Sequence, residues 1–193
     1  MALENFLSFV SDFKGVASLI AKAALIAPFA TLILNIGPPW PAKTAVPALT
    51  ALCEVFVLIY IFQFFTRLSR KKLDTRLRVY FGLLVLSFVI YLFLYSFFVF
   101  DITMTNERDV KGFILLPAIA SQVAKGETTE SLLSGAEWDP FAIWEGWTIY
   151  ATRAAMLLSW ILFFVGIAGC MAVFVTAQRK AARAAPTASP GTS

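Results

Sequence analysis

The stretch RLSRKKLDTRLRVYFGLLVLSFVIYLFLYSFFVF, from Arg67 to Phe100, decides the fold class of this chain. Its second part, Val79 to Phe100, contains no charged residue. An α-helix needs roughly 20 apolar residues to cross a hydrocarbon core about 30 Å thick, and this part is long enough. The part before it is strongly cationic. The stretch therefore predicts a transmembrane helix that starts from a positively charged membrane surface.

Three other apolar runs have similar length: Val16 to Ile36, Ala45 to Thr66 and Ala154 to Ala177. The whole chain is 59% hydrophobic and 15% charged, whereas soluble domains carry roughly 25% charge. We therefore predict an all-α membrane protein with one four-span domain over residues 1–183. The last residues, 184–193, are rich in Ala, Pro, Ser and Thr and are expected to be disordered.

Charge on the two sides of these spans predicts the topology. The link between spans two and three carries six cations: Arg67, Arg70, Lys71, Lys72, Arg76 and Arg78. The segment between spans three and four, residues 101–147, is acidic. By the positive-inside rule the link and both termini are cytoplasmic, as in a multi-pass protein of the cell inner (plasma) membrane.

Helical periodicity extends outside the spans. Apolar residues recur at helical spacing near the N-terminus and predict an amphipathic helix on the inner leaflet, or an extension of span one: Leu3, Phe6, Leu7, Val10 and Phe13. In the external segment, Asn106 with Asp109 predicts a helix start and Gly126 a helix end.

The end of the external segment predicts an early start for the last helix. Asp139 and Pro140 form an N-cap and N1 pair, so the helix of span four is expected to begin outside the membrane and run to Lys180. Aromatic residues gather where it would enter the headgroups: Trp138, Trp144, Trp147 and Tyr150. The apolar residues 113–120 are interrupted by Pro117 and are too short to span, so they pack on the interface, on another subunit or as a re-entrant turn.

Glu54 is the main candidate for a functional group, because an ionisable residue inside a span is costly and must face protein or water. With Thr50 one turn earlier, it would belong to an ion or proton path. The alternative is structural: Glu54 pairs with Arg153 at the outer boundary of span four, or is protonated against a hydroxyl group.

A polar stripe in span three offers a second candidate. Ser87, Tyr91 and Tyr95, with Tyr80, share one helix face. Such a stripe lines a narrow pore or makes interhelical hydrogen bonds. In span four, Gly166 with Cys170 and Ala168 with Ala172 have the small-xxx-small spacing that permits close helix contact.

Several chemistries are excluded by composition. Histidine is absent, and the two cysteines, Cys53 and Cys170, lie in separate apolar runs. Imidazole or thiolate metal sites, haem held by histidine and Ser-His catalysis therefore cannot be built. We expect no cofactor and no enzyme activity.

Four short spans enclose little volume, so we expect a homo-oligomer, with a tetramer as the working number. The favoured function is a pore or channel-like effector. The alternative is a membrane sensor or scaffold that recruits a cytoplasmic protein or nucleic acid through the basic link, which also suits anionic lipid headgroups. A transporter subunit or membrane enzyme ranks lower.

In overall plan the chain resembles the small four-span membrane subunits of bacterial phage-defence systems such as Kiwa and Hailong. The resemblance covers the span count, the basic link and the acidic segment 101–147. It implies a homo-oligomer in a bacterial inner membrane that acts in antiviral defence and is controlled by a separate cytoplasmic partner. It assigns no site residue.

Overall fold

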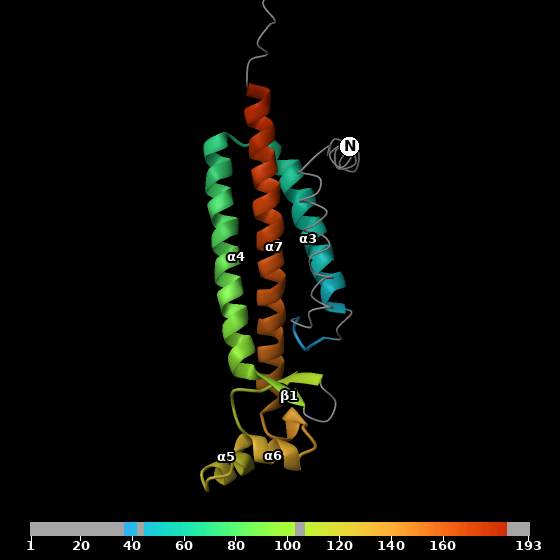
Figure 1. Ribbon diagram of the computed structural model, residues 1–193, viewed down its shortest axis with the longest axis vertical. Coiled ribbons are helices and arrows are strands. Elements are labelled where there is room, and N and C mark those ends of the chain that lie inside the picture. Colours follow the sequence, from blue (N-terminus) through green and yellow to red (C-terminus); the bar gives the residue numbers. More distant parts are fainter. Residues whose placement is uncertain (1–36, 42–44, 103–106, 185–193) are drawn as a thin grey trace, which may run out of the picture.

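The computed structural model describes residues 37–41, 45–102 and 107–184. It contains three long helices that lie side by side, with a small cap at one end (Figure 1). They are α3 (Ala45–Phe64), α4 (Arg70–Phe98) and α7 (Gly146–Ala184). All three are long and apolar enough to cross a membrane, as expected for a multi-pass membrane protein. The predicted first span, the N-terminal amphipathic helix and residues 185–193 lie outside the described residues.

The two ends of this bundle differ, and we name them by what they contain. The cap end holds residues 99–102 and 107–145, and the basic end holds the short connection between α3 and α4, with the last turns of α7 beside it. The connection is a 3-10 turn, η1 (Phe65–Arg67), followed by the extended Leu68. α4 therefore starts at Arg70, well before the predicted Val79. Most of the predicted basic link is the first part of a helix.

α7 is the central helix. Half of its most apolar window is buried, against 33% for α3 and 11% for α4. Small residues explain its position, because they let the neighbouring helices approach closely. A β-carbon at Gly166 would lie 2.9 Å from Cα of Leu84 on α4. On the α3 side, Ala168 and Ala172 are buried in one cluster with Leu58.

The predicted small-residue spacing in α7 is therefore confirmed for Ala168 and Ala172. On the other face, Gly169, which the predicted spacing did not include, lies against the ring of Tyr80. Both glycines face α4 and both alanines face α3. One helix thus presents two small-residue faces to two neighbours.

The cap is a mixed structure. Its hairpin pairs β1 (Val99–Ile102) with β2 (Glu107–Val110) in antiparallel register, with Val99 opposite Val110. Two short helices follow, α5 (Pro117–Val123) and α6 (Thr129–Gly135), and then the 3-10 turn η2 (Pro140–Ala142). A core of apolar side chains joins these elements to the start of α7: Phe100, Leu133, Ile143, Trp144 and Ile149.

The predicted all-α cap with a helix starting at Asn106 and Asp109 is wrong, because 107–110 form a strand. Backbone pairing with 99–102 outweighs the local capping signal, and the Lys111 N–H donates to the Phe98 carbonyl at 2.7 Å to continue the ladder. Pro117 starts α5 and does not interrupt a helix, in keeping with proline at N1. Gly126 has a positive φ of 101° just after α5, which fits its predicted role in ending a helix.

The predicted N-cap at Asp139 is present, but it begins only a single helical turn. Asp139 Oδ1 accepts a hydrogen bond of 2.9 Å from the Phe141 N–H at the start of η2. The chain then becomes extended, because Trp144 forms an antiparallel β-bridge with Leu115. Next to it, the Glu145 N–H donates to the Ile114 carbonyl at 2.9 Å. A continuous helix from Asp139 is therefore wrong. α7 begins at Gly146, before the predicted Ala154, and runs to Ala184.

Candidate functional site

Glu54 lies near the middle of α3 and is fully buried, with 0% of its surface exposed. Neither carboxylate oxygen has a hydrogen-bond partner among the described residues. Its depth follows from the packing of α3 on α7. Nearer the cap end, Val46 packs in one cluster with Trp160, and nearer the basic end Leu58 packs with Ala168. Glu54 lies between these contacts, close to the turn of α7 that contains Phe164.

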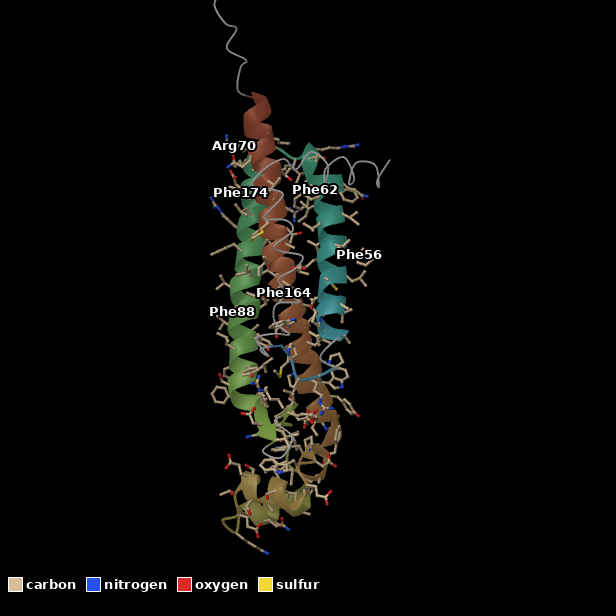
Figure 2. The ribbon with its side chains drawn as sticks, turned by 45° about the vertical axis from the view of Figure 1, so that its right-hand side comes forward. Phe56, Phe62, Arg70, Phe88, Phe164 and Phe174 are labelled. Atoms are coloured by element: carbon tan, nitrogen blue, oxygen red, sulfur yellow. The ribbon has the colours of Figure 1, made fainter. Side chains whose placement is uncertain are left out.

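Figure 2 agrees with this placement, since it shows Phe56 of α3 slightly nearer the basic end than Phe164 of α7. Phe56 is on the opposite face of α3 and is exposed, whereas Phe164 is buried. The apolar face of α3 that points away from α7 is therefore exposed on the outside of the bundle. The carboxyl group is on the face that meets the bundle.

Thr50 is also fully buried and lies one turn from Glu54 on the same face of α3. Its hydroxyl donates to the carbonyl of Val46 at 2.8 Å, within its own helix. This bond satisfies the donor of Thr50 without any contribution from Glu54. The pair shares a face, as expected for residues four apart.

Trp160 was not identified from the sequence. It lies in the middle of α7, and its indole Nε1–H is buried without an acceptor among the described residues. Tryptophan in membrane proteins usually lies at the headgroups. Its position in the middle of an apolar run was therefore the feature of the sequence that could have identified Trp160. Its ring packs against those of Tyr91 and Phe164, each at a centroid distance of 5.0 Å. A buried carboxyl group on α3 and a buried donor on α7 thus flank the same stretch of the helix interface.

The predicted polar stripe of α4 faces α7. Ser87 and Tyr91 are buried, and the Ser87 hydroxyl donates to the Leu83 carbonyl at 2.6 Å. Tyr95 accepts a hydrogen bond of 2.5 Å from Arg108 Nη1 in the hairpin. The Ser87 hydroxyl therefore bonds within α4, to the carbonyls of Leu83 and Leu84, and the buried members of the stripe lie inside the bundle.

Arg153 does not pair with Glu54. Its Nη2 lies 2.5 Å from Asp109 Oδ1 on β2, and its guanidinium lies 5.4 Å from the ring centre of Phe141. The physical reason is depth: Arg153 is eleven residues before Phe164 on α7, about 16 Å along the axis. The pair with Asp109 ties the cap to α7.

The six cations of the connection and of the first part of α4 are all exposed: Arg67, Arg70, Lys71, Lys72, Arg76 and Arg78. They surround Leu73, which is fully buried in the cluster with α7. Arg76 lies over the ring of Phe65, 5.8 Å from its centre. Lys180 of α7 donates to the carbonyl of Leu68, which holds the end of α7 against the connection.

The chemistry of the site is that of an isolated carboxyl group. Within residues 37–41, 45–102 and 107–184, no group of three His, Cys, Asp or Glu side chains is arranged to hold a metal ion. Glu54 is therefore suited to exchange a proton or to meet a single cation or water inside the bundle. Comparison of the chain with protein-family models, curated proteins and solved structures found no match.

Proposed function

We propose that this protein is an oligomeric, channel-like effector of the membrane in which Glu54 is the conducting group. The observation that carries the proposal is the complete burial of an unpartnered carboxyl group halfway along α3. A carboxylate in hydrocarbon costs several kcal/mol unless it is protonated, hydrated or paired. A protein retains such a residue at a functional position, and Glu54 has no structural partner among the described residues.

The position of the polar residues favours a path inside each subunit. Thr50 and Glu54 of α3 and Ser87 and Tyr91 of α4 are buried against α7, and the faces of α3 and α4 that point outward are apolar. A central pore formed where four outer faces meet would be lined by those apolar residues. We therefore place the conducting path along the α3–α7 contact that contains Glu54.

The wider setting is part of the same proposal. It includes four spans, cytoplasmic termini, a tetrameric homo-oligomer and a role in bacterial antiviral defence under the control of a separate partner. Charge asymmetry supports the topology. The defence role rests on the architectural resemblance alone.

Ion flux through liposomes that contain the purified protein tests this function. Glu54→Gln keeps the size and burial of the side chain but removes the ionisable group. We expect it to change proton or cation flux by at least roughly tenfold, which corresponds to about 1.4 kcal/mol in the barrier. Ser159→Ala is the matched control, because Ser159 is also buried and its hydroxyl donates within its own helix, to the carbonyl of Met156.

Equal flux in wild type and in both variants would remove Glu54 from the path. Flux absent from all three, with correct assembly, would reject a channel that conducts without its partner and would favour the second candidate. Trp160→Phe extends the test, since it removes the buried indole N–H but keeps an aromatic ring in the same place.

A scaffold for a cytoplasmic acidic protein or nucleic acid is the second candidate. The observation in its favour is the exposure of all six cations between Arg67 and Arg78. Its test is the binding of a polyglutamate peptide and of an RNA oligonucleotide to protein in detergent. Binding that falls steeply with salt and with the Lys71→Gln, Lys72→Gln variant would support it. A transporter subunit or an enzyme has less support, because the described residues contain a single carboxyl group at this interface.

A further inference from the structure

The last two cations of α4, Arg76 and Arg78, lie further into the bundle than its tip at Arg70. The antiparallel register of α4 on α7 is set by four contacts: Tyr80 with Gly169, Leu84 with Gly166, Phe88 with Phe163, and Tyr91 with Trp160. Continued toward the basic end, the register places Arg76 beside Phe174. The contact between Leu68 and Lys180 agrees with it.

The neighbours remain apolar at this depth. The ring of Phe65, in the turn η1 that follows α3, lies under the guanidinium group of Arg76. Phe174 of α7 is 49% exposed, and Phe64 of α3 is 58% exposed. Figure 2 shows Arg70 at the tip of α4 and Phe174 further into the bundle. Exposed aromatic side chains and exposed arginines therefore occupy one layer.

A second layer of cations lies nearer the tip. Arg70 starts α4, and Arg67 ends the turn before it. Arg70 lies six residues, about 9 Å, beyond Arg76 along the axis of α4. A soluble acidic partner would meet this outer layer first.

We propose that the deep layer, formed by Arg76 and Arg78 with Phe174 and Phe64, binds anionic phospholipid headgroups of the leaflet at the basic end. A phospholipid brings both components that this surface needs, a phosphate for the guanidinium groups and acyl chains for the exposed rings. Arginine suits phosphate because its planar fork donates two hydrogen bonds at once. A soluble protein or nucleic acid brings the charge without the acyl chains. This inference does not depend on the channel function.

The two layers offer matched variants, since each contributes two arginines. Arg76→Gln with Arg78→Gln removes the deep pair, and Arg67→Gln with Arg70→Gln removes the outer pair. Binding of phosphatidylglycerol and of phosphatidylcholine to the full chain in detergent is measured by native mass spectrometry. We expect wild type to prefer phosphatidylglycerol by roughly tenfold or more, because each basic residue near anionic lipid contributes about 1 kcal/mol.

The deep-pair variant is expected to lose most of this preference and the outer-pair variant to keep most of it. A third variant, Arg76→Lys with Arg78→Lys, retains the charge and should bind at an intermediate level. Unchanged melting temperature and subunit count show that the bundle is intact. If the deep double variant does not fold, Arg78→Gln alone is compared with Arg70→Gln alone.

Two results would overturn the proposal. One is equal binding of the two lipids by wild type. The other is a loss in the outer-pair variant as large as or larger than that in the deep-pair variant, which would assign the cations to a soluble acidic partner.

Discussion

The two ends of the bundle use charge in opposite ways. At the cap end, charged side chains contact one another: Arg153 pairs with Asp109, and Arg108 pairs with Asp101 at 3.1 Å. At the basic end the cations of α4 are exposed, and Asp74 is the only acidic residue between Arg67 and Arg78. Charge at the cap end therefore holds elements together. Charge at the basic end remains available to a partner or to lipid.

Chain geometry accounts for the difference. The hairpin β1–β2 folds back over the start of α7 and brings acidic and basic residues from separate elements into contact. The connection from α3 to α4 is too short for such a return, and its residues enter a helix almost at once. Neighbouring like charges on one helix cannot neutralise each other. The comparison gives three predictions about stability.

The largest effect is expected for Arg153→Met. Side chains of Arg153 and Asp109 are only 10% and 23% exposed, and removal of one partner leaves the other charge largely buried. We expect a loss of about 3 kcal/mol in the free energy of unfolding in detergent. A double-mutant cycle with Asp109→Asn measures the coupling. Strictly additive losses would show that the pair does not hold the cap to α7.

A smaller effect is expected for Gly112→Val, next to the hairpin. A β-carbon at Gly112 would lie 2.6 Å from Cβ of Trp144 and would also collide with the Thr148 hydroxyl. We expect a loss of about 1–3 kcal/mol from this overpacking, measured in the same unfolding assay. The control is Gly135→Ala in α6, where a β-carbon meets nothing within 4 Å. Equal stability of both variants would contradict close packing of the cap on α7.

The smallest effects compare exposed charges at the two ends. Asp101 is 81% exposed, so Asp101→Asn should cost at most about 1 kcal/mol and lose its effect at high salt. Lys72→Gln at the basic end should change stability by less than about 0.5 kcal/mol. Thermal unfolding at low and high salt measures both. A loss in Lys72→Gln as large as that in Arg153→Met would remove the distinction between the two ends.

Sequence patterns predicted much of the helical framework. Apolar runs of sufficient length predicted α3, α4 and α7, and small residues predicted close packing of α7. Local capping signals were less informative. Asp109 looked like a first-turn residue of a helix, yet it lies in β2, because its backbone pairs with β1 and its carboxylate accepts from Arg153.

The candidate site was predicted in part. Glu54 and the stripe of Ser87, Tyr91 and Tyr95 stood out because polar residues are rare in apolar runs. Trp160 did not stand out, because a tryptophan in an apolar run looks like any other large apolar side chain until its N–H is known to be buried without an acceptor. Trp144 was expected at the headgroups, but it is buried in the cap, and Trp147 and Tyr150 are the exposed ones.

Sequence by itself determined which segments leave water, since that depends on the summed hydrophobicity of about 20 consecutive residues and needs no knowledge of their neighbours. Only the tertiary structure decided which charged side chains pair with each other. Arg153 pairs with Asp109, 44 positions away in the chain, and not with Glu54. Pairing depends on the depth and direction of side chains on different helices, which the order of residues along one chain does not specify. The same reason explains why the isolation of Glu54 and the depth of Arg76 became apparent only when the helices were packed together.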